Sequence, residues 1–265
     1  MSFALFKKTA LLDEASILWM FDSFEWAMEN FSADVFYQET ILVNPSNAHF
    51  PGNESSAEAM ATLIFEKVKH YAGLQHWPFQ LVADELVESI DVPNIVIPGA
   101  LRGSAGTSLV EQPSQRFVVP SNLVLLRDPE VLIATYAHAL SHYLGSKANQ
   151  APPGGIENWP HVTELLSVYL GFGLIMANTA HTAKIRSCGS CSGPSVERSN
   201  FLSQYDITYA LAIFCFLKNI SANEAQRHLK KTLRPFFKKA HKDIGGRSSQ
   251  LEVLFRHRNK LSLSN

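Results

Sequence analysis

The sequence has few of the residues that mark an exported or membrane-bound protein. Only three of its 265 residues are cysteines, and an odd number argues against a disulfide framework. No segment reaches the roughly 18 uninterrupted apolar residues of a membrane-spanning helix. Residues 1–16 also lack the apolar run of a signal peptide. We therefore expect a cytoplasmic protein without a membrane segment.

Charge is scarce as well, and it is unevenly distributed. Charged residues make up 18% of the chain and hydrophobic residues 46%, which indicates a globular protein. Residues 227–260 hold eleven Lys and Arg against two acids, whereas the rest of the chain holds twelve against 22. This basic segment either lies on the acidic body of its own chain, is solvated, or contacts an acidic partner. No aromatic stacking pattern or nucleic-acid motif accompanies it, so nucleic acid is not the expected partner.

The apolar pattern changes character near residue 122. Before it, helical spacing over 11–31 and 55–73 alternates with short β-like runs at 39–46, 79–86, 94–101 and 116–121. After Asp128 the pattern is helical. The sequence predicts one α+β domain over residues 1–265, with a small mixed sheet in the first half and a helix-rich second half. A soft sub-boundary falls near residue 122, and a basic C-terminal helix and tail covers 222–265.

The segment DPEVLIATYAHALSHYLG, residues 128–145, has complete helix signals. Asp128 is the expected N-cap, Pro129 occupies the first helical position and Gly145 is the stop. His138 and His142 are four residues apart, so they lie on one face and can direct ring nitrogens at one cation.

A hydrolytic zinc site usually has three protein ligands and a water. The helix that follows, HVTELLSVYLGFG, offers Glu164 in its first turns. The sequence therefore predicts a Zn²⁺ site formed by His138, His142 and Glu164.

This arrangement resembles the zincin superfamily of metallopeptidases, in which HExxH on one helix and a carboxylate on the next hold zinc. The gluzincin-type subset, with a glutamate as third ligand, is the nearest match. The segments AHALSH and TELLSVYLGFG also resemble AHELAH and TDLL…FLGFG of an uncharacterised bacterial family. The resemblance implies a zinc hydrolase that acts on a peptide or isopeptide bond of a peptide or protein substrate.

The chain departs from that pattern at Ala139, where the motif has its glutamate. In such sites the glutamate accepts a proton from the metal-bound water, and alanine has no titratable group. We expect metal binding to survive and hydrolysis to be lost. Ala139 is explained either by an engineered Glu-to-Ala change, which we favour, or by a natural pseudoenzyme.

Alternatives to a metal site stay open. HxxxH also occurs by chance in amphipathic helices, where buried histidines are hydrogen-bonded core residues. The rival hypothesis is then a non-catalytic helical binding module whose basic C-terminal segment contacts an acidic partner. Other residues are weaker site candidates. Tyr209 or Tyr205 could stabilise an oxyanion, and His161 could be a further ligand or partner. Glu157 could be a substitute base, and Cys188 and Cys191 could form a thiol pair.

Overall fold

The computed structural model describes residues 11–87, 92–107, 115–180 and 201–262. Its longer elements are α1 (Glu14–Asn30), α2 (Ala33–Gln38), α3 (Ala57–Ala72), β1 (Phe79–Ala83), β2 (Phe117–Ser121), α4 (Pro129–Gly145), α5 (Trp159–Ser167), α6 (Gly173–Thr179), α7 (Gln204–Leu217), α8 (Ala222–Ala225), α9 (Arg234–Gly245) and α10 (Ser248–Ser262). Short 3-10 turns cover Asp84–Leu86, Leu123–Arg127 and Ile156–Asn158, and a π-helical turn, Val168–Phe172, joins α5 to α6.

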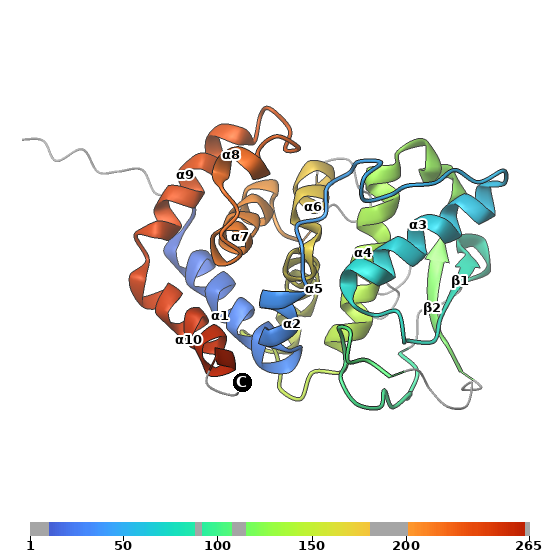
Figure 1. The fold of residues 1–265 in the computed structure, drawn as a ribbon, viewed down its shortest axis with the longest axis horizontal. Helices are drawn as coiled ribbons and strands as arrows, with labels where there is room; N and C mark the ends of the chain where they lie inside the picture. The colour runs from blue at the N-terminus through green and yellow to red at the C-terminus, as the bar shows by residue number, and fades with distance from the viewer. Residues whose placement is uncertain (1–10, 88–91, 108–114, 181–200, 263–265) are drawn as a thin grey trace, which may run out of the picture.

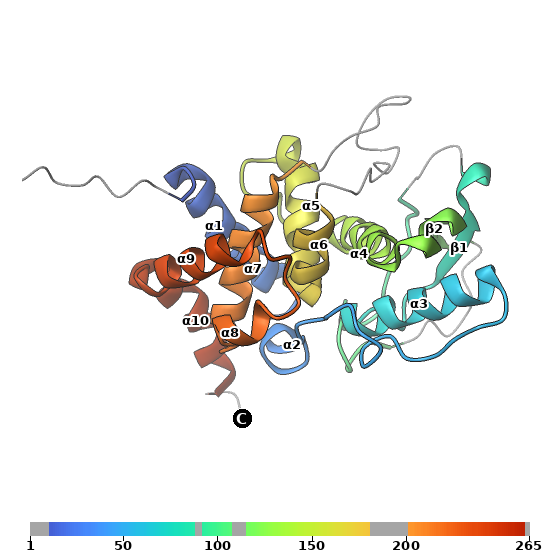
Figure 2. The ribbon, with the colours of Figure 1, turned by 90° about the horizontal axis from the view of Figure 1, so that it is seen from above.

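The elements form successive layers along the long axis of the molecule (Figures 1 and 2). Helices α5 and α6 lie at the centre. On one side α7 packs against α6, and α9 packs against α7. On the other side α4 packs against α5 and α6, and α3 and β2 pack against α4. The two histidines of the HxxxH segment therefore lie between the sheet side and the helical side.

The central helical stretch is buried throughout. Every residue from 162 to 180 is buried, as expected for a helix that is apolar on all sides. Its π-helical turn contains Gly171 with φ +101°, and a Cβ there would collide with the carbonyl oxygen of Ile41. The Val43 N–H donates to the Gly171 carbonyl at 2.9 Å. Residues 39–46 therefore pack on this turn as irregular chain, and the expected strand there was wrong.

The sheet is smaller than expected and its strands are parallel. Strand β1 pairs with β2, with Phe79 opposite Phe117, and the described residues contain no further strand. The expected run at 94–101 makes only an isolated antiparallel bridge, between Gly99 and Gly106. Proline has no N–H for a strand ladder, and Pro93 and Pro98 flank and interrupt this run. The α+β class is confirmed, whereas the mixed sheet is replaced by a parallel pair.

Local helix signals were reliable. Ser56 caps α3, and Gly73 ends it in the left-handed region with φ +75°. Helix α4 begins with Asp128 at the N-cap and Pro129 at the first position, although the Asp128 side chain makes no capping bond. Ser203 and Asp206 form the expected reciprocal capping box of α7. Side chains that bond to their own backbone fix helix starts locally.

The basic C-terminal segment docks on its own chain. Helix α9 packs on α7, and α10 packs on α1 and α2. Arg247 donates to both carboxylate oxygens of Glu14, at 2.6 and 2.9 Å, and to Asp243 at 2.8 Å. Lys238, Lys239 and Lys242 stay exposed on the outer face of α9. Buried apolar side chains from Ile17 to Leu254 form one cluster.

Candidate functional site

The histidine pair lies on one buried face of α4. His138 is 6% exposed and His142 is 3% exposed. Burial, and next the neighbouring His142 ring, lower the pKa of His138 from 6.5 to about 4. Desolvation disfavours the charged form of a histidine. His138 is therefore neutral at physiological pH, a state in which an imidazole can bind a metal or accept a hydrogen bond.

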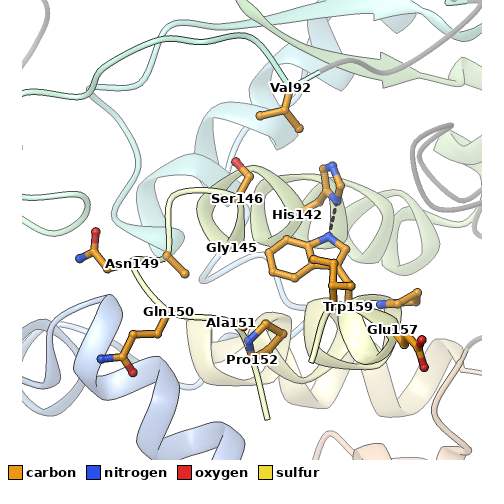
Figure 3. Close-up of a pocket in the computed structure, with 13 residues that line it drawn as sticks. Val92, His142, Gly145, Ser146, Asn149, Gln150, Ala151, Pro152, Glu157 and Trp159 are labelled. Carbon is orange, nitrogen blue, oxygen red and sulfur yellow. Dashed lines mark hydrogen bonds between the residues drawn. The ribbon is translucent and has the colours of Figure 1, made fainter. Parts of the chain in front are cut away.

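His142 is held by the first residue of the next helix. The indole Nε1–H of Trp159 donates to Nδ1 of His142 at 3.2 Å (Figure 3). The indole packs over Gly145, where a Cβ would lie only 2.7 Å from its Cη2 atom. The glycine expected to stop α4 thus also makes room for the ring that orients His142.

This hydrogen bond determines the tautomer of His142. A nitrogen that accepts a hydrogen bond carries no proton, so the proton of the neutral ring is on Nε2. A metal-ligating histidine shows the opposite arrangement, in which the ring nitrogen away from the metal donates its N–H. With this partner, Nε2 of His142 offers no lone pair to zinc, and Nδ1 offers one only if the Trp159 bond breaks.

The third predicted ligand, Glu164, has other partners. Its side chain is 1% exposed. Its two carboxylate oxygens accept the backbone N–H groups of Phe201, at 2.9 Å, and Leu202, at 2.8 Å. Burial raises the pKa of this carboxyl from 4.5 to about 7, and the two backbone hydrogen bonds partly oppose the rise. Glu164 therefore holds the segment that enters α7.

Helix α5 turns different residues toward α4. The hydroxyls of Ser141 and Ser167 are 2.9 Å apart, and Trp159 contacts His142 and Gly145. The ligand atoms of His138, His142 and Glu164 do not all lie within 4.8 Å of one another. The zinc set stays a prediction, and the arrangement of its three members does not fit a preformed metal site.

One other group could hold a cation by distance alone. Within the described ranges, Glu25, Glu29 and His257 form a group of three whose ligand atoms lie within 4.8 Å. Glu25 and Glu29 are one turn apart on α1, and His257 comes from α10, with Nε2 3.7 Å from a Glu25 oxygen. Glu29 is exposed. The group ties α10 to α1 as an ion pair when His257 is protonated.

An open cavity of about 630 Å³ lies beside His142 (Figure 3). Its walls come from the end of α4, the start of α5, the loop between them, and Val92. Trp159, Ile156 and Pro152 supply apolar surface, and Ser146, Asn149, Gln150 and Glu157 supply polar groups. The volume is in the range of a site for a small ligand or a few peptide residues.

The loop that forms the cavity floor is fixed by α1. Trp19 donates its Nε1–H to the Pro153 carbonyl at 2.9 Å, and Trp26 donates to the Gln150 carbonyl at 3.0 Å. The Asn30 side-chain oxygen accepts the Asn149 N–H at 2.9 Å. These three α1 residues are spaced by seven and four, so they share one face. Sequence reasoning missed them, although two tryptophans and an asparagine at that spacing were a usable signal.

The position of the expected base provides no acid. Ala139 is half-buried against the core. Glu157 lines the cavity together with His142, but its side chain is exposed. The arrangement supplies a buried histidine pair and a shaped cavity, without a carboxylate positioned next to the first histidine.

The weaker site candidates lie elsewhere. The Tyr209 hydroxyl donates to Asp243 at 2.8 Å, and burial raises its pKa, so this phenol belongs to the contact between α7 and α9. Tyr205 is 51% exposed, with its ring 4.8 Å from that of Phe236. His161 lines a second cavity, of about 400 Å³. Cys188 and Cys191 lie outside the described residues.

Comparisons with protein-family models, with curated proteins and with solved structures found no match. One helical stretch, Ile156–Thr179, is long and apolar enough to cross a membrane, but its most apolar window of 18 residues is buried inside the protein. Core helices of soluble proteins have the same length and composition, and this stretch packs as one of them. Any function proposed for this chain is therefore argued from the residues of the site.

Proposed function

We propose that this chain is a non-catalytic peptide-binding protein on a zincin-like scaffold, working in the cytoplasm. The HxxxH helix, the helix after it and the preceding strands follow the order that the resemblance implies. The single observation that carries the proposal is the Trp159–His142 hydrogen bond at 3.2 Å. It commits His142 to the wrong tautomer for zinc while leaving its ring at the wall of a cavity.

Three features support the loss of hydrolysis together. Ala139 cannot accept a proton, Glu164 is bonded to the backbone of residues 201 and 202, and His142 is bonded to Trp159. Restoring a working site would require a change at each of the three. This favours a natural binding protein over a single engineered substitution in an active enzyme.

The cavity suits a short peptide in an extended conformation. The amide side chains of Asn149 and Gln150 can pair with peptide N–H and C=O groups, and the Trp159 and Ile156 side chains offer apolar contact. The loop that carries the two amides is fixed by α1, so little ordering is needed on binding.

A displayed library of random peptides tests the proposal. Enriched peptides are measured by fluorescence polarisation against the wild type, Ile156→Asp and Leu86→Asp. Ile156 lines the cavity and is 72% exposed, and Leu86 is 75% exposed outside it. We expect at least tenfold weaker binding for Ile156→Asp alone, and the peptides should be recovered intact. No enrichment, or equal binding by both variants, contradicts the proposal.

A second candidate is docking of an acidic protein on the outer face of α9. The exposed Lys238, Lys239 and Lys242 favour it, because the inner face of this helix is already buried. Peptides rich in Asp and Glu whose binding is lost in Lys238→Glu/Lys239→Glu, and kept in Ile156→Asp, would support this alternative.

A further inference from the structure

A second cavity, of about 400 Å³, lies where α1, α5 and α7 begin. It shares no lining residue with the cavity at His142. Its lining includes Ser16, Trp19, His161, Phe201, Leu202 and Asp206. These residues come from three segments far apart in the sequence, and none of them is a lysine or an arginine.

Three rings form adjoining walls of this cavity. The Trp19 and His161 ring centroids are 6.4 Å apart with planes at 85°. Those of His161 and Phe201 are 5.6 Å apart with planes at 65°. Rings at steep angles around a shared space can present their negative faces to one positive group, and each such contact is favourable. Among the residues that the structure describes, the buried Nδ1 of His161 has no hydrogen-bond partner.

One carboxylate, that of Asp206, lines the same space. Asp206 accepts the Ser203 N–H with Oδ2 at 3.0 Å, and it faces the cavity with its charge otherwise unpaired by any described cation. Glu164 lies behind the wall, bonded to the N–H groups of Phe201 and Leu202. Burial is the main cause of the raised pKa of Glu164, and the charge of Asp206 adds to the rise.

The N-terminus of a helix normally attracts anions, so the partial positive charge of the helix starts here must be compared with the charge of the nearby carboxylates. Residues at the starts of α1, α5 and α7 line this cavity. However, Asp13 bonds to the Ser16 N–H of α1, and the Ser203–Asp206 box and Glu164 occupy the N–H groups that lead into α7. A helix end carries about half an elementary charge, and a carboxylate carries a full one. At the starts of α1 and α7 an anion would therefore meet carboxylates where its donors should be.

We propose that this second cavity binds an alkylammonium group, with Trp19, His161 and Phe201 as its aromatic walls and Asp206 as its counter-ion. The shared chemistry is a positively charged nitrogen that carries alkyl groups, as on a methylated lysine side chain or in choline. Methylation spreads the charge and lowers the cost of desolvation, so methylated forms should bind better than the primary amine.

Isothermal titration of the full chain tests the proposal with named probes. The probes are choline, its neutral carbon isostere 3,3-dimethylbutanol, and N-acetyl-lysine methylamide with zero or three methyl groups on Nζ. We expect choline and trimethyl-lysine to bind about tenfold or more tightly than the isostere. Preference for trimethyl-lysine over choline would identify a protein partner as the source, and the reverse would identify a free metabolite. Equal binding of choline and its isostere overturns the proposal.

Variants keep the test independent of folding. Asp206→Asn retains an oxygen for the α7 cap while removing the charge, and Trp19→Phe retains a ring while removing its bond to Pro153. We expect Asp206→Asn to weaken choline binding about tenfold and Trp19→Phe to weaken it less. Tyr205→Leu, an exposed aromatic of α7 outside the cavity, is the matched control and should bind as the wild type does. Unchanged binding by Asp206→Asn, with its thermal unfolding intact, contradicts the assignment.

Discussion

Trp159 donates its indole N–H to Nδ1 of His142 across the contact between α4 and α5. This one bond joins the two helices that in the resembling peptidases would share a zinc ion. It fixes the ring orientation of His142 and leaves its proton on the nitrogen that a metal would need. The contact between α4 and α5 is therefore stabilised by a hydrogen bond between two side chains.

Restoring the missing motif glutamate should not restore hydrolysis. In Ala139→Glu the base position is filled, but Glu164 still binds the backbone ahead of α7 and His142 still accepts from Trp159. We expect no turnover of a mixed peptide library with added zinc, measured by mass spectrometry. Zinc-dependent cleavage by Ala139→Glu, absent in Ala139→Gln, would show that the ligand set is competent.

His138 should make the protein more stable as pH rises. Its folded pKa of about 4 lies below the ordinary 6.5, so the unfolded chain binds the proton more readily between these values. Its contribution is fully present above pH 6.5, and it is lost as pH falls toward 4, by about 3 kcal/mol in total. In His138→Phe, the unfolding free energy measured with urea should lack this rise between pH 4 and 6.5. The matched variant His228→Gln, at an exposed histidine, should retain the rise.

Glu164 should have the opposite pH dependence. Its folded pKa of about 7 lies above the ordinary 4.5, so the folded protein holds the proton more tightly between these values. Stability is therefore lost as pH rises from 4.5 to 7, again by about 3 kcal/mol. The two contributions oppose each other in the wild type. Replacing either His138 or Glu164 should therefore reveal the pH dependence of unfolding free energy that the other residue contributes.

Glu164→Gln separates charge from hydrogen bonding. The amide accepts one backbone N–H and turns an NH₂ group toward the second, which should cost about 1–3 kcal/mol at pH 5. Unfolding free energy should then rise with pH because the opposing Glu164 contribution is gone and the His138 contribution remains. A pH profile parallel to that of the wild type would contradict the burial of the Glu164 charge.

Gly145→Ala tests the packing of Trp159 on α4. The added methyl group would lie 2.7 Å from the indole, so the ring must shift and its bond to His142 must weaken. We expect a loss of about 1–3 kcal/mol in unfolding free energy and weaker peptide binding. Alanine favours helices over glycine by about 1 kcal/mol, so Gly245→Ala, at the more open end of α9, serves as the control. Equal stability changes at the two positions would contradict the proposed contact.

Local signals in the sequence predicted most helix boundaries. Ser56, Ser203 and Pro129 act on the backbone within one turn, so their effect depends little on the rest of the fold. The strand at 94–101 was wrong because pairing depends on a partner edge, and the two prolines leave too few N–H donors for a ladder. The class of the fold could be predicted, and its sheet could not.

The candidate site shows a similar division. Spacing correctly places His138 and His142 on one face of α4, because the helical period alone determines that. Glu164 was expected to face them from α5, but the face that a helix presents depends on its rotation within the core. Trp159, five residues earlier, makes the contact to His142 instead. Its role depends on Gly145 in the neighbouring helix, and no pattern within α5 shows that.

The tautomer of His142 is the most direct test of the account. Long-range ¹H–¹⁵N correlation spectra of uniformly labelled protein, recorded with and without zinc, report which ring nitrogen carries the proton. We predict a proton on Nε2 of His142, and an equivalent of zinc should not change this. In Trp159→Phe, which keeps a ring but has no N–H donor, the proton should no longer be confined to Nε2. A proton on Nδ1, or a zinc-induced change at both His138 and His142, would contradict the account and restore the metal site.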